Sequence, residues 1–311
     1  MKGVFFKGLL MGIADLVPGI SGGSIALILG IYEKLLNSIK TLDKKALSFL
    51  FKGQLSSFFS YVEWKFLLYL FLGIITSFVI FSHFFNFMFK NHLGKVCLFS
   101  FFLGSMISAT LSLLKNVSWN FTHIFFLILG VTLTFFLTSY KNLDVILFQD
   151  TLFSPFLIIS GCLAICAMLL PGISGSSMLV ILGVYIPALD NLTLFLQNLK
   201  HLVIAKEQMF FLFNLIIGMV IGIVLFSRII LFFMKRFKVK MLSFIIGLMF
   251  GSCISIWPFY STRTSKLSIL NMTLPSILSI DFLLFIAFAY LGFFLFNKLK
   301  KLQQLNKYEK N

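Results

Sequence analysis

A sixteen-residue stretch occurs twice in the chain and decides its organisation. Residues 17–32 read VPGISGGSIALILGIY, residues 170–185 read LPGISGSSMLVILGVY, and ten of the sixteen aligned positions are identical. Self-similarity at a fixed spacing is the signature of an internal repeat. We therefore expect two copies of one structural unit, the first at residues 1–150 and the second at residues 151–311.

The composition indicates the class of protein to which these units belong. The chain has 311 residues, of which 59% are hydrophobic and 12% charged, and its mean hydropathy is +1.02. A soluble domain is about 45–50% apolar and about 25% charged. The chain is therefore predicted to be an all-α integral membrane protein. Its net charge of +16 would suggest a nucleic-acid partner in a soluble chain, but here we attribute it to basic loops that orient the protein, so no nucleic acid is expected.

Three long apolar runs follow the repeated stretch in each copy. They cover residues 66–89, 96–114 and 121–140 in the first copy, and residues 209–234, 241–259 and 282–297 in the second. A transmembrane helix needs about 20 mostly apolar residues. We therefore expect three transmembrane helices in each unit.

The repeated stretch itself suits a re-entrant helical hairpin better than one broken span. About 15 residues lie on each side of its Pro-Gly turn, so each arm is about 22 Å long, whereas the hydrocarbon core is about 30 Å thick. Re-entrant hairpins would place 18 Lys and Arg residues on one side of the membrane and seven on the other, and single crossings would place 14 and 11. The positive-inside rule favours the hairpins. This choice places both termini in the cytoplasm and inverts the second unit relative to the first, as in many secondary transporters.

The turns of the two hairpins carry the residue types of an anion site. Proline ends the entering helix, glycines permit a tight backbone, and serines stand where the next helix begins. Unpaired backbone amides at that point and nearby hydroxyls can bind an anion. The predicted substrate-binding residues here are Ser21, Gly22, Gly23, Ser24, Ser174, Gly175, Ser176 and Ser177. The alternative is a kink whose small residues only allow close helix packing.

Ionisable residues inside apolar runs are further candidates, because charge is costly in a membrane. Asp15 precedes the first turn, and its counterpart in the second copy is Met168. Arg228 lies in a predicted span, and its counterpart is His83. We expect Asp15 or His83 to carry protons and Arg228 to bind the substrate as a counter-ion. The alternatives are that Arg228 reaches toward the basic loop at 235–240 and that His83 lies at the membrane interface.

Signatures of soluble enzymes do not occur in the sequence. It contains no Walker loop, no dinucleotide-binding glycine pattern and no HExxH motif, each of which would indicate a particular chemistry. We therefore predict no catalytic residue, no metal site and no cofactor.

The paired motifs resemble a known family. Residues 12–24 (GIADLVPGISGGS) and 30–33 (GIYE), with residues 170–176 (LPGISGS) and 183–185 (GVY), are similar to the signatures of the bacterial polyprenyl-phosphate transporters. Ser24 stands where the family pattern has Thr, which keeps a hydroxyl. The resemblance covers nearly the whole chain. It implies a multi-pass protein of the bacterial cytoplasmic membrane that returns undecaprenyl phosphate, the lipid carrier of cell-wall precursors, from the outer to the inner leaflet.

The implied substrate sets an energetic problem. A lipid phosphate carries about −1.5 to −2 charges at pH 7, and moving it inward opposes the membrane potential by about 2.3 kcal/mol per charge per 100 mV. We expect proton coupling to offset this cost, so the expected partners are polyprenyl phosphate, membrane lipids and protons. The alternative is an integral-membrane polyprenyl-diphosphate phosphatase, although neither turn supplies the Arg, His or paired Glu that phosphoryl transfer needs. An ion channel or a scaffold is a third possibility, without a charge ring or carbonyl filter to favour it.

Overall fold

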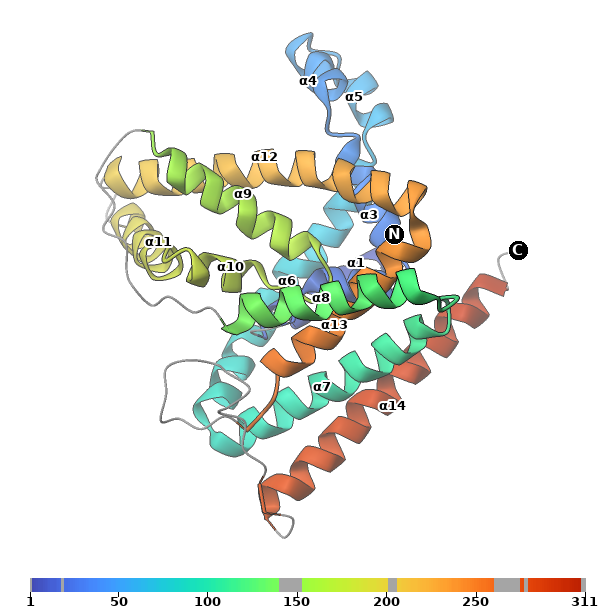
Figure 1. Cartoon of the computed structure of the whole chain (residues 1–311). Coiled ribbons are helices and arrows are strands. Elements are labelled where there is room, and N and C mark those ends of the chain that lie inside the picture. Colours follow the sequence, from blue (N-terminus) through green and yellow to red (C-terminus); the bar gives the residue numbers. More distant parts are fainter. Residues whose placement is uncertain are drawn as a thin grey trace.

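Helices make up all the regular structure in the part of the chain that the structure describes (Figure 1). The structure is a computed structural model of the chain, and it describes residues 2–17, 20–139, 153–200, 206–259, 275–276 and 279–308. The first half contains α1 (Lys2–Asp15), α2 (Gly22–Ile28), α3 (Tyr32–Lys40), α4 (Lys44–Phe51), α5 (Leu55–Tyr61), α6 (Trp64–Lys90), α7 (His92–Leu114) and α8 (Phe121–Ser139). The second half contains α9 (Pro155–Leu169), α10 (Gly175–Ile181), α11 (Tyr185–Lys200), α12 (Lys206–Arg236), α13 (Lys238–Ser255) and α14 (Ile280–Tyr308). The predicted boundary between the two units falls within 140–152, outside the described residues.

The six predicted spans correspond to α6, α7 and α8 in the first half and to α12, α13 and α14 in the second, although α13 ends at Ser255, before the predicted limit of residue 259. Four of them, namely α6, α7, α12 and the segment Ile280–Lys298 of α14, are long and apolar enough to cross a membrane. Helix α8 is a shorter apolar helix, as is α9. The protein is therefore a multi-pass, all-helical membrane protein, as the composition predicts.

Helices of each half pack as parallel pairs through glycines at matching positions. In the α1–α6 pair, a Cβ on Gly8 would meet the Leu70 carbonyl oxygen at 2.1 Å. In the α9–α12 pair, a Cβ on Gly161 would meet the Leu215 carbonyl oxygen at 2.2 Å. Small residues let membrane helices approach closely, so larger residues at these two positions would separate the helices. Gly8 and Gly161 are equivalent in the repeat, so the sequence repeat is also a repeat of packing.

The remaining long helices form a second kind of parallel pair, and each pair joins the two halves. In the α7–α14 pair, a Cβ on Gly104 would meet the Ala289 carbonyl oxygen at 1.9 Å. In the α8–α13 pair, a Cβ on Gly247 would meet the Leu127 carbonyl oxygen at 2.1 Å. One helix of each pair comes from each half, so neither half buries its long helices alone.

The repeated stretches form broken helices with short inner segments. Helices α2 and α10 have seven residues each, or about 10 Å of length, so neither crosses the membrane alone. Gly30 and Gly183 then turn the chain with φ angles of +65° and +69°, which favour glycine. The chain bends by 109° between α10 and α11, as a broken span or a re-entrant loop would. Of the first turn, Pro18 and Gly19 lie outside the described residues.

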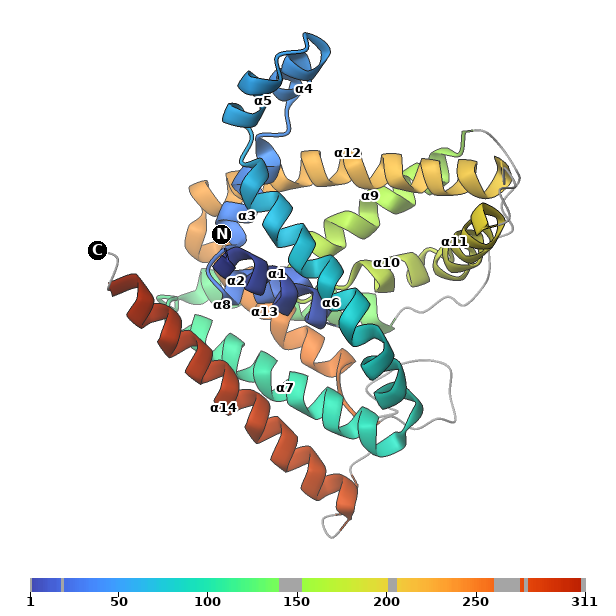
Figure 2. The same ribbon diagram turned by 180° about the vertical axis from the view of Figure 1, so that it is seen from behind.

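The two hairpins meet in the interior of the bundle (Figure 2). The main core packs residues of α1, α2 and α3 against α7, α12 and α13, and it includes Ala14, Tyr32 and Met249. Helices α4 and α5 project from the bundle, and the start of α1 and the end of α14 lie toward the same end of the molecule in both views. The core therefore places the turn of one hairpin beside the turn of the other.

Candidate functional site

The turns of the two hairpins are tied directly to each other. Three hydrogen bonds cross between them, from Ser21 Oγ to the Met168 carbonyl at 3.0 Å, from the Gly172 amide to Ser24 Oγ at 2.8 Å, and from the Tyr32 hydroxyl to the Leu169 carbonyl at 2.8 Å. The three side chains are buried. The last carbonyls of a helix have no donor within that helix, and the first half supplies two of these missing donors to α9.

A cavity of about 250 Å³ lies between the hairpins. Its polar side chains are Asp15 and Ser21 from the first hairpin and Ser174 and Ser176 from the second. Apolar side chains of α6, α9, α10 and α12 complete the wall. Drug-sized ligands occupy pockets of roughly 300–1,000 Å³, so this cavity suits a small head group rather than a long lipid chain.

The first turn is already occupied by the protein's own groups. The Gly22 amide donates to Asp15 Oδ1 at 2.6 Å, and the Gly23 amide donates to Ser21 Oγ at 3.1 Å. We expected these amides to be free for a substrate, and the structure corrects that expectation. The Asp15 carboxylate itself is the anion that this turn binds. Its other oxygen, Oδ2, is buried and accepts no hydrogen bond from the described residues.

The second turn has no such internal anion, because Met168 stands where the first has Asp15. Ser174 makes no side-chain cap, and its Oγ lies 2.6 Å from Ser176 Oγ. The backbone amides of Gly175 and Ser176 donate to no group in the described residues. The two turns thus differ chemically, since the second lines the cavity with hydroxyls and unpaired amides and the first lines it with the Asp15 carboxyl group and the Ser21 hydroxyl, which already form hydrogen bonds. Together they can hold an anion that shares a proton with that carboxylate.

Five of the predicted site residues, Asp15, Ser21, Ser174, Gly175 and Ser176, line this cavity. The other predicted site residues do not line it, namely Gly22, Gly23, Ser24, Ser177, His83 and Arg228. On α12, Arg228 is nine residues beyond the lining residue Met219, or about 13 Å along the axis, and it lines a different pocket. On α6, His83 is five residues beyond the lining residue Phe78, or about 140° around the helix, and its side chain is exposed. The roles predicted for Arg228 and His83 would therefore act away from the hairpin turns.

Sequence reasoning assigned no role to Tyr32, which joins the two hairpins. The available signal was the repeated pattern of a glycine followed two residues later by a tyrosine, at residues 30–32 and 183–185. Only the first of these tyrosines makes the bond. The pattern could thus have drawn attention to Tyr32, but not to its partner 137 residues away.

Comparison with known proteins agrees with these observations. A family model described as undecaprenyl phosphate translocase-like matches residues 11–294. The chain is 34% identical over 266 residues to a protein of Vibrio cholerae serotype O1 named polyprenyl-phosphate transporter, covering 85% of this chain and 80% of that protein. It is 33% identical over 263 residues to a Staphylococcus aureus protein of the same name, covering 81% of this chain and 84% of that protein. No solved structure matches the chain significantly. With a match across most of its length and two such relatives, the chain belongs to the undecaprenyl phosphate translocase-like family.

Proposed function

We propose that this protein carries polyprenyl phosphate across the bacterial cytoplasmic membrane, from the outer to the inner leaflet, so that the lipid carrier is reused. The cavity that both hairpins line carries this proposal, because it joins hydroxyls and free amides from one turn to a carboxylate from the other. Its size suits a phosphate, while the isoprenoid chain stays in the lipid. The names of the relatives from Vibrio cholerae and Staphylococcus aureus support this substrate.

We further propose that the two units have inverted topology, as in many transporters that alternate access around one central site. Equivalent helices form equivalent pairs, α1 with α6 and α9 with α12, which supports two copies of one unit. The odd number of crossings per unit that the Lys and Arg distribution favours would then invert the second copy. This proposal agrees with the start of α1 and the end of α14 lying toward the same end of the molecule (Figure 2). Under this arrangement the two turns approach the cavity from opposite faces.

Proton coupling is assigned to Asp15 in this proposal. A fully charged phosphate moving inward would oppose about 2.3 kcal/mol per charge per 100 mV. The unpartnered Oδ2 of Asp15 is the atom at which a proton can reside, and a proton there lets Asp15 donate a hydrogen bond to a phosphate oxygen. The Gly22 amide holds Oδ1 in place during this exchange. The proton then travels with the head group and reduces its net charge.

The experiment follows polyprenyl phosphate in proteoliposomes that contain the full-length protein. Loss of lipid phosphate from the outer leaflet is measured with and without an inward proton gradient. We expect Asp15→Asn to abolish the response to the gradient, while Ser174→Ala lowers the rate at every pH. Transport by Asp15→Asn at the wild-type rate and with the wild-type pH response would remove the coupling role.

A parallel measurement tests the alternative enzyme. Purified protein is incubated with a polyprenyl diphosphate, and released phosphate is quantified. We expect no release above the protein-free control, because the cavity wall contains Asp15 and serines but no cation or second carboxylate to activate water. Phosphate release that Ser174→Ala abolishes would assign the cavity to hydrolysis instead.

A further inference from the structure

A second polar pocket lies at one end of α12, away from the hairpin cavity. It has a volume of about 620 Å³ and forms where the last turns of α12 pass the end of α3 and the start of α4 (Figure 1). Five cations line it, namely Lys40, Lys44, Arg228, Lys235 and Arg236. Leu231 and Phe232 add an apolar wall between them. Such a cluster of positive charge beside apolar side chains can attract an anion that carries an apolar chain.

The carboxylate in this pocket forms no salt bridge with these cations, although the charge of Arg228 acts on it at longer range. Asp43 Oδ1 accepts the amides of Lys45 and Ala46, each at 2.9 Å, and Asp43 Oδ2 accepts the Tyr61 hydroxyl at 2.8 Å. Both oxygens are thus used to begin α4 and to hold α5. In the described residues, no salt bridge joins any of the five cations to a carboxylate.

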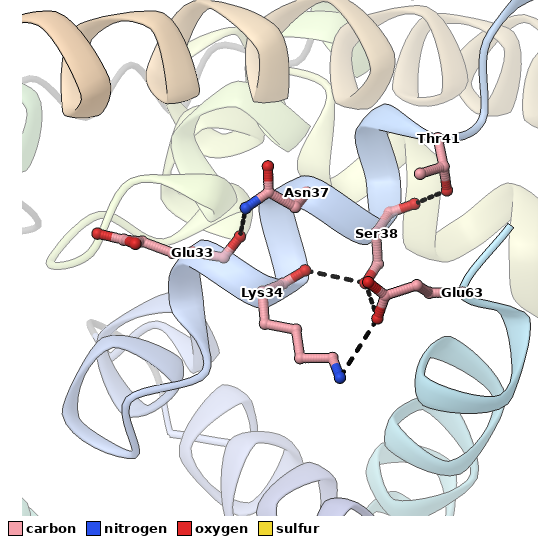
Figure 3. A network of polar contacts seen from close by, with 6 residues as sticks. All are labelled: Glu33, Lys34, Asn37, Ser38, Thr41 and Glu63. Atoms are coloured by element: carbon pink, nitrogen blue, oxygen red, sulfur yellow. Dashed lines mark hydrogen bonds and ion pairs between the residues drawn. The ribbon is translucent and has the colours of Figure 1, made fainter. Parts of the chain in front are cut away.

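A neighbouring lysine, Lys34, differs from these five cations because it is paired with a carboxylate. Lys34 forms a salt bridge of 3.3 Å with Glu63, the residue that precedes α6, and Ser38 Oγ donates to the same carboxylate (Figure 3). Thr41 Oγ1 donates to the Ser38 carbonyl at 2.6 Å. This network fixes the end of α3 against α6. It therefore holds Lys40 and the following Lys44 beside α12 without using their charges.

Arg228 is a lining residue of this pocket with a buried donor atom. Its Nε atom is buried and has no hydrogen-bond partner in the described residues. An unpaired buried donor of a charged group is costly, so a ligand that accepts from it would stabilise the structure. Helix α12 has 31 residues, or about 46 Å of length, and Arg228 lies about 12 Å from its end. Since the hydrocarbon core is about 30 Å thick, a centred α12 leaves about 8 Å outside the core at each end. The Arg228 backbone then lies about 4 Å inside the core, and its long side chain can reach the level of the lipid head groups.

We propose that this pocket binds the phosphate monoester head group of a membrane lipid, at a site separate from the hairpin cavity. The doubly charged head group would accept from Arg228 and from the surrounding lysines. The first carbons of the lipid chain would lie against Leu231 and Phe232, a contact that free phosphate lacks. A phosphate diester carries only one charge and uses the cations less completely. The proposal stands on this pocket alone and does not require that the protein transports the lipid.

Native mass spectrometry of the full-length protein in detergent tests this assignment with three probes. These are farnesyl phosphate, a short-chain phosphatidylglycerol and inorganic phosphate. We expect farnesyl phosphate to bind most tightly and to lose affinity as ionic strength rises, since salt screens partly exposed charges. Equal binding of phosphatidylglycerol would overturn the monoester assignment, and equal binding of inorganic phosphate would overturn the lipid assignment.

Matched pairs of variants locate the bound lipid. Each basic residue near a membrane surface contributes about fivefold to the binding of an anionic lipid. We therefore expect Lys44→Gln and Lys235→Gln each to weaken farnesyl phosphate binding about fivefold. Lys45→Gln and Lys238→Gln change neighbouring lysines that do not line the pocket, and we expect wild-type affinity from both. Equal losses in a lining variant and its neighbour would overturn the site.

Arg228 is tested by two substitutions, because a change at this partly buried position of α12 affects folding more readily than a change at the lysines. We expect Arg228→Lys to keep most of the binding and Arg228→Gln to lose more than either lysine variant, at equal monomer yield on size exclusion. Ser174→Ala, which changes only the hairpin cavity, separates this site from the other. Loss of farnesyl phosphate binding in Ser174→Ala but not in Lys44→Gln would place the lipid in the hairpin cavity and overturn the proposal.

Discussion

The hydrogen bond between the Tyr32 hydroxyl and the Leu169 carbonyl predicts a stability difference between two equivalent tyrosines. Tyr32→Phe removes one oxygen atom and leaves the ring in place, so it creates no large cavity. The Leu169 carbonyl, whose residue is only 7% exposed, then has no donor from α3. An unsatisfied buried acceptor costs about 1–3 kcal/mol. The shift falls with chain length and is about 2 °C per kcal/mol at the upper end of 150–250 residues, so for this longer chain we expect the thermal midpoint to fall by about 2–6 °C.

Tyr185→Phe is the matched control, because Tyr185 occupies the equivalent position in the second hairpin. Its hydroxyl donates to no group in the described residues, and its side chain is only partly buried. A substitution of this kind changes stability by less than about 0.5 kcal/mol. Both variants and the wild type are heated in one detergent, and unfolding is followed by intrinsic fluorescence and by size exclusion of the surviving monomer. Equal midpoints for the two variants would refute the claim that Tyr32 holds the hairpins together.

Three further predictions address the turns and the projecting helices. A Cβ on Gly22 would meet Asp15 Oδ2 at 2.4 Å, so Gly22→Ala should displace the carboxylate from the Gly22 amide. A hydrogen bond to a charged group contributes about 1.5 kcal/mol, so we expect lipid transport to slow about tenfold. An unchanged transport rate would contradict this role of the bond. Ser176→Ala should weaken substrate binding about two- to tenfold. Ser177 lies outside the cavity wall, so Ser177→Ala should bind the substrate as the wild type does. Equal effects of the two variants in a lipid-binding titration would favour a site at the start of α10 over the cavity. Hydrogen bonds from the amides of Ala46 and Lys45 and from the Tyr61 hydroxyl, together with the charge of Arg228, hold the pKa of Asp43 below its usual range despite partial desolvation. The amides of α4 should therefore be fully protected from hydrogen exchange above pH 4, near the Asp pKa of about 3.9 in the unfolded chain. This protection should be lost as the pH falls through the lower pKa of Asp43 in the folded protein. Hydrogen exchange of the α4 amides measures the loss, and Asp43→Asn should show reduced protection already at pH 7.

Periodicity and composition predicted the helices but not the bonds between them. The repeat at residues 17–32 and 170–185 could be recognised in the sequence because local structure dictates its residue types. The helices are interrupted there, which requires Pro and Gly, and they pack closely, which requires small residues. The long helices could be predicted because an apolar run long enough to span a membrane can adopt few structures there other than a helix. The co-location of Ser21 and Ser174 in one cavity also followed, since two broken helices within a bilayer require a shared protected space.

The partners of individual polar groups could not be predicted. Tyr32 and Leu169 are 137 residues apart, and Ser24 and Gly172 are 148 residues apart, so their bonds depend on how whole helices pack. The sequence showed Asp15 as a charge near a turn, but not that its carboxylate would bind the Gly22 amide of that turn. The sequence predicted Arg228 as a counter-ion for the substrate, whereas the structure places it in a pocket separate from the hairpin cavity.

The three bonds between the hairpins have a mechanical consequence. The carbonyl ends of α9 are held by hydroxyls of the first half, so the two turns cannot separate without exposing several polar atoms to hydrocarbon. We expect this junction to stay closed and rigid throughout a transport cycle. The outer pairs α7–α14 and α8–α13 would then rotate about the junction to give access to one leaflet and then to the other. A covalent bridge between the two turns would therefore leave the transport rate unchanged.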